Sequence, residues 1–239
     1  MKLYEKLFPD FLKRLIEPVA GRTNEFVLSA VNQTNHDSLV LDAGAGEGRH
    51  KSLVKNRQYI AIDAAWGDED WDYSSLDVIG NLTQLPFSSG IFDCTLCIQV
   101  LEHVREPQKV LNELFRTLKP GGFICLTAPQ GAGVHQPPND YFRYTNYGLT
   151  YLFENAGFEI IELKPICGYF GYLANRFTVF PKTLFWQIQK KWLRLILFPF
   201  EMISYLIFVV VFPIILNTFD FLDRKKKYTL NYMAMAKKP

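Results

Sequence analysis

Short apolar runs alternate with amphipathic segments along the chain up to residue 165. Seven apolar runs have the length and composition of β-strands, and they cover 38–44, 59–63, 76–81, 92–100, 123–129, 158–165 and 228–238. Apolar residues at helical spacing predict helices at 3–16, about 22–33, 107–122 and 146–158. Pro18 and Gly21 are expected to separate the first two helices, and Gly121 suits the C-terminal cap of the third. This alternation predicts an α/β fold with a mostly parallel seven-stranded sheet and helices on both faces.

Polar residues end four of the predicted strands. Asp42, Asp63, Asn81 and Gln99 each lie at the carboxyl end of an apolar run. Ligands of open parallel sheets bind beyond the carboxyl ends of the strands. We therefore expect these four side chains to line one ligand site.

The first predicted strand runs into the glycine-rich stretch "DAGAGEG", residues 42–48. It is either a simple turn or a loop that lets a ligand approach the backbone. Its spacing differs from the G-x-G-x-x-G of dinucleotide sites, and Asp42 and Glu47 would repel a pyrophosphate. Two carboxylates suit a cationic ligand such as S-adenosylmethionine, which carries an ammonium and a sulfonium. Gly44 and Gly46 would let the chain pass close to that ligand, and Gly48 would ease packing of the helix that follows.

This loop resembles motif I, D-x-G-x-G-x-G, of class I S-adenosylmethionine-dependent methyltransferases. The stretch "VIGNLTQLPFSSGIFDCTLCIQVLEHVREPQKVLNELFRTLKPGGFICLTAP", residues 78–129, is similar to the rest of a type-11 methyltransferase domain. The resemblance covers about residues 35–165 plus the last strand and implies a Rossmann-like fold. It implies that Asp63 binds the ribose, which also fits its place about twenty residues after Asp42. It further implies that Asn81, where the family usually has Asp, meets the adenine amino group.

The resemblance also implies that the backbone of Leu82 meets the adenine ring and that Gln99 lies beside the methionine portion. The expected cofactor-binding residues are Asp42, Ala43, Gly44, Ala45, Gly46, Gly48, Asp63, Asn81, Leu82 and Gln99. A third interpretation, a nicotinamide-dependent oxidoreductase, is disfavoured by the glycine spacing and by the two acids.

Two segments are candidates for the acceptor side of the site. "VLEHV" places Glu102 and His103 just after the fourth strand, and His103 is the first candidate for a general base because histidine titrates near neutral pH. Glu102 is the weaker candidate for a base, and the alternative is that the pair is a structural landmark that packs against and caps the next segment. The stretch "HQPPNDYFRYT", residues 135–145, follows the fifth strand and offers His135, Asp140, Tyr141 and Arg143 as acceptor-binding residues. It is otherwise a well-ordered loop that closes the site.

Composition narrows the partners and cofactors. The 239 residues carry a net charge of +2, which does not suggest a nucleic-acid partner. Cys94 and Cys97 are spaced like a metal pair, but an odd separation on a strand points them to opposite faces. We therefore expect no metal at this pair, and no metal site is predicted elsewhere. The four cysteines show no disulfide framework, which fits a reducing cytoplasm.

A hydrophobic stretch precedes the last predicted strand. Residues 202–219, between Glu201 and Asp220, carry no charge, and this length is the lower limit for crossing a bilayer. Basic residues flank the stretch at 190–194 and 224–227. If the last strand returns beside the sixth, both ends lie on one side and a single span is excluded. A re-entrant hairpin, an in-plane amphipathic pair and a helical cap on the protein remain possible.

These patterns predict two parts of the chain. Residues 1–168 and 226–239 would form the cofactor-binding domain with N-terminal helices, and 169–225 a hydrophobic helical insertion. Residues 178–222 are expected to contact membrane lipids and to hold the protein on the cytoplasmic face of a membrane. The expected function is S-adenosylmethionine-dependent methyl transfer to a small-molecule, glycan or lipid-linked acceptor at that surface. The alternative is a catalytically silent methyltransferase-like module that binds partners at the membrane.

Overall fold

The computed structural model describes residues 16, 18–67, 70–185 and 187–239, and these form two compact units. The larger unit comprises Thr23–Pro165 and Asn231–Pro239, and the smaller one comprises Ile166–Leu230 with the described residues up to Arg22. The helix predicted at 3–16 lies outside the described residues except for its last position.

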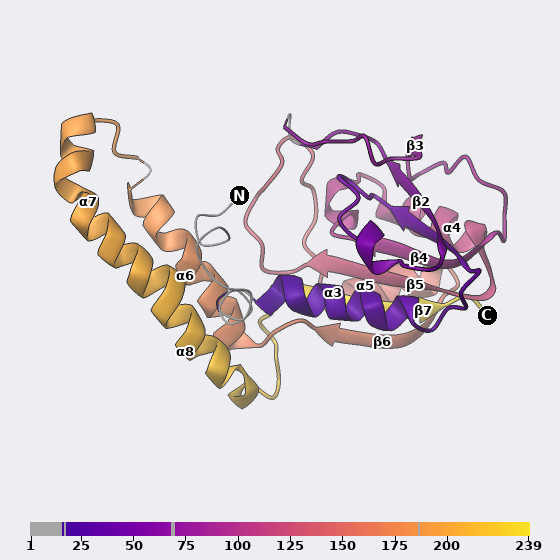
Figure 1. The fold of residues 1–239 in the computed structure, drawn as a ribbon. Coiled ribbons are helices and arrows are strands. Elements are labelled where there is room, and N and C mark those ends of the chain that lie inside the picture. The colour runs from indigo at the N-terminus through magenta and orange to yellow at the C-terminus, as the bar shows by residue number, and fades with distance from the viewer. Residues whose placement is uncertain (1–15, 17, 68–69, 186) are drawn as a thin grey trace. The chain divides into compact units, whose positions relative to one another are not determined.

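A seven-stranded sheet forms the centre of the larger unit (Figure 1). Its strands are β1 (Leu39–Ala43), β2 (Gln58–Asp63), β3 (Val78–Ile79), β4 (Phe92–Ile98), β5 (Leu118–Pro129), β6 (Glu159–Pro165) and β7 (Asn231–Lys237). The strand order is β3-β2-β1-β4-β5-β7-β6. β7 runs antiparallel to both of its neighbours, while β1 to β5 pair in parallel. The predicted strands and the return of the last strand beside the sixth are confirmed.

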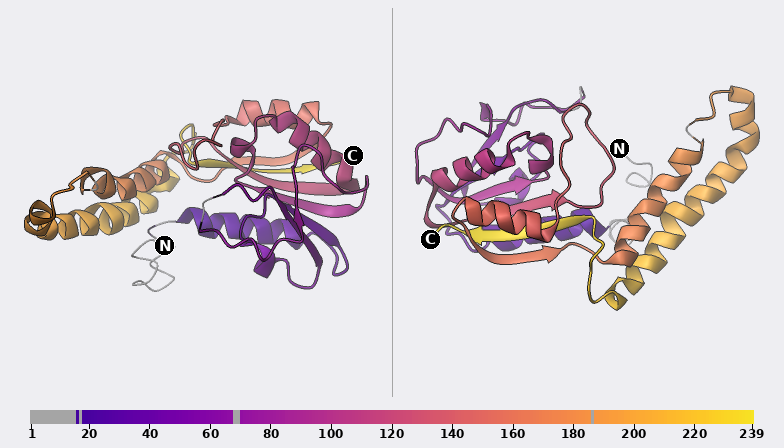
Figure 2. Two further views of the ribbon diagram at one scale, coloured as in Figure 1. Left: turned by 90° about the horizontal axis from the view of Figure 1, so that it is seen from above. Right: turned by 180° about the vertical axis from the view of Figure 1, so that it is seen from behind.

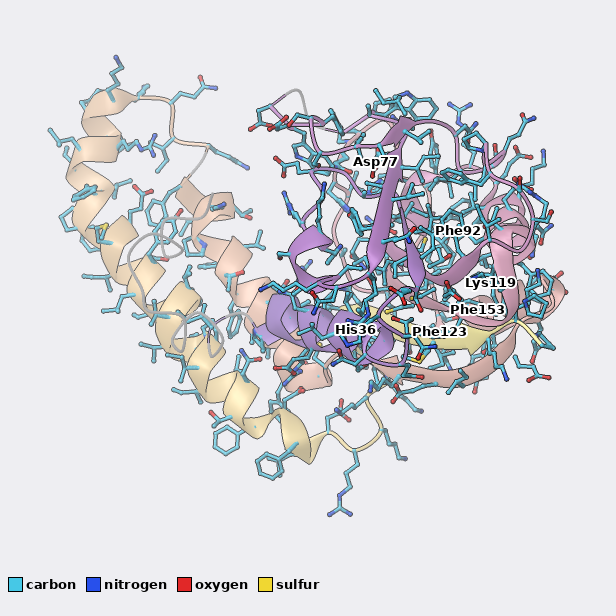
Figure 3. The ribbon with its side chains drawn as sticks, turned by 45° about the vertical axis from the view of Figure 1, so that its right-hand side comes forward. His36, Asp77, Phe92, Lys119, Phe123 and Phe153 are labelled. Carbon is cyan, nitrogen blue, oxygen red and sulfur yellow. The ribbon has the colours of Figure 1, made fainter. Side chains whose placement is uncertain are left out.

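Helices cover both faces of this sheet, as predicted (Figure 2). One face carries α3 (Pro18–Val31), and the other carries α4 (Pro107–Thr117) and α5 (Asn146–Asn155). The main core lies on the second face, where Phe92 of β4 and Phe153 of α5 are fully buried (Figure 3). Because β1 and β4 are buried between two helical layers, their sequences are nearly continuous apolar runs rather than alternating ones.

The first described helix begins earlier than predicted. It runs from Pro18, whose fixed φ suits a first helical turn, and it passes through Gly21. Gly21 has nothing within 4 Å of the place a Cβ would occupy, so the glycine neither breaks the helix nor permits a close contact. The expected break at Gly21 is therefore wrong, and burial of Phe26, Val27 and Ala30 stabilises the helix despite it.

The predicted helix 107–122 ends five residues early. α4 stops at Thr117, and β5 begins at Leu118, which pairs with Phe92 of β4. Lys119 forms an ion pair with Asp93 across the same two strands at 2.8 Å. Gly121 has a φ of +80° inside β5, and its amide donates to the carbonyl of Lys238 at 2.9 Å. Gly121 therefore shapes the strand and does not cap the helix.

The expected helix after the glycine loop is also absent from the described residues 44–57. This segment forms a single 3₁₀ turn at Lys51–Leu53 before β2. Its sequence, "GAGEGRHKSLVKNR", offers only Leu53 and Val54 as large apolar side chains. Such a segment has no apolar face wide enough to bind an α-helix to the sheet.

The smaller unit is a helical hairpin. Its elements are α6 (Tyr169–Phe185), α7 (Lys191–Tyr205), a π-helical segment (Leu206–Val211) and α8 (Phe212–Phe219). An aromatic cluster joins α6 to the opposite arm: the ring of Phe208 lies 5.6 Å from Phe177, 4.6 Å from Phe180 and 5.3 Å from Phe212, centroid to centroid. By contrast, most of the large apolar side chains of α7 are exposed.

The two ends of this hairpin are bound to each other. The buried Asp220 carboxylate accepts hydrogen bonds from the amides of Gly168 and Gly171, at 2.9 Å and 2.8 Å, which lie at the start of α6. Asp223 accepts from the amide of Tyr169 at 2.8 Å. Side chains from the end of the insertion thus cap the helix at its beginning.

Candidate active site

The glycine loop between β1 and the 3₁₀ turn has a backbone that only glycine adopts easily. Gly44, Gly46 and Gly48 have φ values of +82°, +52° and +70°. A Cβ on Gly44 would lie 2.3 Å from a Val100 methyl, so the loop packs directly against the segment that follows β4. The loop therefore joins the ends of β1 and β4, the position expected for a cofactor site.

Asp63 connects this loop to the end of β2. Its carboxylate accepts hydrogen bonds from the amide of Gly46 at 2.9 Å and from the amide of Ala65 at 2.7 Å. Each carboxylate oxygen has capacity for a further donor. Asp63 thus shapes the loop and can still bind ribose hydroxyls, and the ribose role stays a prediction.

The two acids of the loop lie in different surroundings. Asp42 is buried, and the Tyr59 hydroxyl donates to its Oδ2 at 2.7 Å. Its Oδ1 has no hydrogen-bond partner among the described residues, so an acceptor is left that a ligand donor could satisfy. Glu47 instead forms an ion pair with Arg49 at 2.7 Å, and this hydrogen-bonded guanidinium lowers the pKa of Glu47. Of the two acids, Asp42 fits a cationic cofactor and Glu47 is engaged elsewhere.

The other predicted cofactor residues lie at the ends of β3 and β4. Asn81 is exposed, and its Oδ1 accepts from the amide of Thr83 at 2.9 Å, while Leu82 is buried. Gln99 has a φ of +57°, and its side chain donates to the Thr127 hydroxyl at 3.1 Å. A left-handed backbone at a non-glycine residue is uncommon and costs free energy, and such strain is typical of functional sites.

An aromatic residue beside the glycine loop was not predicted from the sequence. A Cβ on Gly46 would lie 2.9 Å from the Trp71 ring, and the Arg49 guanidinium lies 5.6 Å from the centroid of that ring. Trp71 follows β2 by eight positions in a segment without periodic pattern. Only the three-dimensional structure brings it to the loop.

Glu102 and His103 lie just after Gln99, in a 3₁₀ turn at Leu101–His103. Glu102 is fully buried, and neither of its carboxylate oxygens has a hydrogen-bond partner within the described parts of the chain. Burial raises the pKa of Glu102 to about 8, and burial lowers the pKa of His103. The His103 Nδ1 lies 2.6 Å from the carbonyl oxygen of Asn139, so this nitrogen carries the proton and Nε2 has a free lone pair.

The loop 135–145 folds over this pair. His135 and His103 pack edge to face with centroids 4.8 Å apart. The Asp140 carboxylate binds Arg143 through two bonds of 2.6 Å and 2.7 Å, and this hydrogen-bonded guanidinium holds the pKa of Asp140 well below its usual range. Tyr141 donates to the Asn139 side chain at 3.0 Å.

Arg143 donates its hydrogen bonds to the loop and to the two residues 132 and 133 just before it. Besides Asp140, it donates to the carbonyls of Ala132, Gly133 and Phe142, at 2.9 Å, 2.7 Å and 2.7 Å. The four predicted acceptor-side residues therefore form one ordered cluster with Glu102 and His103. Their role in binding an acceptor stays a prediction.

Replacing Asp63 with alanine is expected to weaken S-adenosylmethionine binding by roughly 1–3 kcal/mol, because ribose donors and the Gly46 amide lose a charged acceptor. Titration calorimetry measures the change. Asp63→Asn is the matched control, since it keeps one acceptor oxygen and should lose less. Equal affinity of the alanine variant and the parent protein would contradict the ribose role, and measurable binding of a nicotinamide dinucleotide would contradict the choice of cofactor.

Comparison with known proteins agrees with this geometry. Residues 41–126, which include the glycine loop, Asp63 and Glu102–His103, match the sequence profile of a family described as "Methyltransferase domain". An uncharacterized protein of Methanocaldococcus jannaschii is 27% identical over 198 residues, which cover 79% of this chain and 86% of that protein. A "Probable S-adenosylmethionine-dependent methyltransferase" of Mycolicibacterium smegmatis is 34% identical over 133 residues, covering 51% of this chain and 52% of the relative.

The chain therefore spans about half the length of the mycobacterial relative. The crystal structure of the cyclase SpnF has the same fold, with a TM-score of 0.55 at 18% identity over 89% of this chain and 80% of that one. At this identity the likeness concerns the fold alone. The profile match, the mycobacterial relative and the sheet order agree with the motif at the end of β1. Together these findings support a class I S-adenosylmethionine-dependent methyltransferase, with the methyltransferase domain at residues 41–126 and S-adenosylmethionine as its cofactor.

Proposed function

We propose that this methyltransferase acts at the cytoplasmic face of a membrane on a small-molecule, glycan or lipid-linked acceptor. One observation carries the proposal. The helical run Lys191–Leu222 is 32 residues long and, by length and composition only, is the one helix among the described residues that could cross a membrane. Only 6% of its most apolar window is buried within the protein. A patch of this kind on a monomer marks an interaction surface.

The connections of the hairpin support attachment from one side. Its two ends continue into neighbouring strands, where Pro165 of β6 pairs with Tyr232 of β7. Within the hairpin the Cys167 amide donates to the Thr229 hydroxyl at 3.2 Å. A segment whose ends are joined in this way leaves and returns on one side of a bilayer, so it enters as a re-entrant hairpin or lies in the interface plane.

Charge and aromatic placement support the cytoplasmic side. Lys190, Lys191 and Arg194 precede the uncharged stretch 202–219, and the basic residues Arg-Lys-Lys-Lys at 224–227 follow it. Cytoplasmic flanks tend to be basic, and anionic lipids attract each such residue by about 1 kcal/mol. Trp192 is 61% exposed among these charges, where an indole can contact both headgroups and acyl chains. An enzyme held there meets lipid-linked acceptors at high local concentration.

The larger unit offers the groups that methyl transfer needs. The backbone of Gly44 and Gly46 and the carboxylates of Asp42 and Asp63 would hold the cofactor, and the cofactor supplies an electrophilic methyl group when bound. Gln99 would lie beside the methionine portion. Alignment of the acceptor with that methyl group can supply much of the rate enhancement, and the Glu102–His103 turn follows Gln99 on the acceptor side.

Charged substitutions on the exposed apolar face test the location. We expect the double variant Ile203→Glu/Leu206→Glu to lose flotation with phosphatidylglycerol-containing vesicles, because the two positions are 55% and 57% exposed and two buried charges would oppose insertion. Tyr151→Glu, which places a charge at a 65% exposed position on α5, should float like the parent protein.

Cofactor affinity separates location from activity. S-adenosylmethionine should bind the double variant as it binds the parent, since Ile203 and Leu206 belong to the smaller unit. Parent protein that remains unbound by anionic vesicles would overturn the membrane proposal. Parent protein that binds vesicles but not the cofactor would favour a silent anchoring module.

A further inference from the structure

Three metal-ligating side chains meet at the turn that follows β4. Glu102, His103 and His135 offer a carboxylate oxygen and two imidazole nitrogens that all lie within 4.8 Å of one another. Glu102 Oε1 and His103 Nε2 are 3.9 Å apart, too far for a hydrogen bond between them. His103 and His135 are 32 positions apart in the sequence, and no spacing pattern predicts that they meet; no metal site was expected here.

From this juxtaposition we propose that Glu102, His103 and His135 bind a divalent transition-metal ion that receives the oxygen of the methyl acceptor. Two imidazoles and one carboxylate with open positions form a ligand set that zinc and similar ions accept. The proposal rests on the proposed methyltransferase function for the acceptor, but not for the binding of the ion itself.

The buried carboxylate is an independent observation that points to a ligand. Glu102 has zero exposure, and both of its oxygens are without a hydrogen-bond partner in the described structure. A buried carboxyl group normally has hydrogen bonds or an ion pair, because leaving it without them costs free energy. A cation beside His103 would supply the missing partner.

Both imidazoles are oriented as metal ligands usually are. The Nδ1 of His103 faces the Asn139 carbonyl at 2.6 Å, and the Nδ1 of His135 faces the Gly133 carbonyl at 3.1 Å. Such second contacts fix the tautomer and leave Nε2 free to bind a metal. The nearby Arg143 guanidinium, 3.5 Å from His135 Nδ1, is neutralised by its bidentate pair with Asp140.

The site leaves room for the ion and the acceptor. Three tetrahedral ligands of zinc lie about 3.4 Å from one another, given metal–ligand distances near 2.1 Å. Glu102 Oε1 and His103 Nε2, 3.9 Å apart, are already near that value, and the His135 nitrogen comes closer to both if its side chain, which is 40% exposed, turns toward them. The half-exposed side of the cluster then gives an acceptor access to the remaining positions.

The location suits an oxygen acceptor. Val100, which packs against Gly44, lies two residues before Glu102, so the cluster is next to the predicted cofactor site. A hydroxyl oxygen on the ion would lose its proton to solvent more readily. That oxygen would form the new bond to the methyl carbon, while the carbon–sulfur bond breaks and its electron pair stays on sulfur. The products are the methyl ether and S-adenosylhomocysteine.

Titration of the full chain with Zn²⁺ tests the site directly. We expect one ion per chain, at least about tenfold weaker binding in His135→Ala and in Glu102→Gln, and no binding of Mg²⁺, which prefers oxygen ligands. His36→Ala is the matched control, because His36 lies in an exposed turn outside the cluster (Figure 3) and should leave Zn²⁺ affinity unchanged. His135 is partly exposed, so its variant should fold even if Glu102→Gln does not.

Spectra and turnover complete the test. Co²⁺ in the parent protein should give the visible absorption of a tetrahedral site, and the His135→Ala variant should lose it. A chelator should stop methyl transfer to membrane lipid or glycan extracts without weakening S-adenosylmethionine binding, and Zn²⁺ should restore it. Zn²⁺ affinity that is equal in the parent and both cluster variants, or turnover insensitive to chelation, would overturn the proposal. If the parent protein binds Zn²⁺ but does not bind S-adenosylmethionine, the result would instead count against the proposed methyl transfer.

Discussion

Replacing Gly46 with valine is expected to abolish S-adenosylmethionine binding, with a Kd at least about 100-fold higher, while the protein stays folded. Gly46 has a φ of +52°, and its amide donates to Asp63 at 2.9 Å. A left-handed backbone at a β-branched residue costs about 1–3 kcal/mol of conformational free energy, and the valine Cβ would lie 2.9 Å from the Trp71 ring. The loop would relax by moving the residue 46 amide away from Asp63, and both groups would leave the positions in which they are predicted to bind the cofactor.

A second glycine supplies the control for this experiment. Gly90 has a φ of +68° in the turn before β4, and nothing lies within 4 Å of the place a Cβ would occupy. Gly90→Val therefore carries the same kind of backbone strain without a clash and away from the loop. Calorimetric titration and thermal unfolding of both variants separate strain from binding. If Gly46→Val binds the cofactor as tightly as Gly90→Val, the glycine loop is a turn and not a ligand site.

The strands of the fold were predictable because each is a short apolar run bounded by polar or glycine residues. Boundaries failed where tertiary contacts override a local pattern. Leu118 and Lys119 continue the helical periodicity of α4, yet pairing with Phe92 and the ion pair with Asp93 draw them into β5. A helix was expected after Gly48 because a helix usually follows such a loop, although the 44–57 segment is too polar to bury one.

The placement of the predicted cofactor residues at one edge of the sheet could be read from the sequence. Asp42 and Asp63 lie at the carboxyl ends of β1 and β2, Gln99 follows β4, and parallel strands bring their carboxyl ends together whatever path the loops take. Trp71 and the Gly133 and Asn139 carbonyls belong to irregular segments, whose paths depend on contacts far apart in the sequence. The sequence offers His103 as the first candidate for a general base and Glu102 as a weaker one, but their convergence with His135 depends on the three-dimensional path of the loop 135–145.

The contacts that close the base of the hairpin could not be predicted from the sequence either. No pattern in "ICGYFGY", residues 166–172, predicts that its two glycines leave space for the carboxylate of Asp220, which lies about fifty residues further along the chain. A Cβ on Gly168 would lie 3.0 Å from Asp220 Oδ1, and one on Gly171 would lie 3.2 Å from it. The glycines and Asp220 therefore act together, and Arg22, 3.8 Å from the same carboxylate, adds an ionic contact.

Replacing Asp220 with alanine is expected to destabilise the hairpin by about 3 kcal/mol, because two amides at the start of α6 and the Arg22 guanidinium would lose a buried charged acceptor. Local opening should rise by about 100-fold, since each 1.4 kcal/mol corresponds to a factor of ten. Amide hydrogen exchange of Tyr169–Phe185 in detergent-solubilised protein reports this opening. Exchange of the β4 and β5 amides should not change, because those strands belong to the larger unit.

Asp223→Ala is the matched control for that experiment. Asp223 caps the same helix end through the Tyr169 amide at 2.8 Å but lies in an exposed contact, so its loss should cost about 1 kcal/mol or less. Asp220→Asn, which keeps one acceptor oxygen, should fall between the two alanine variants. Equal exchange in Asp220→Ala and Asp223→Ala would show that the buried carboxylate does not hold the hairpin together. If the hairpin opens as expected, vesicle binding should weaken in the same order, because an opened base no longer keeps both arms on one side of the membrane.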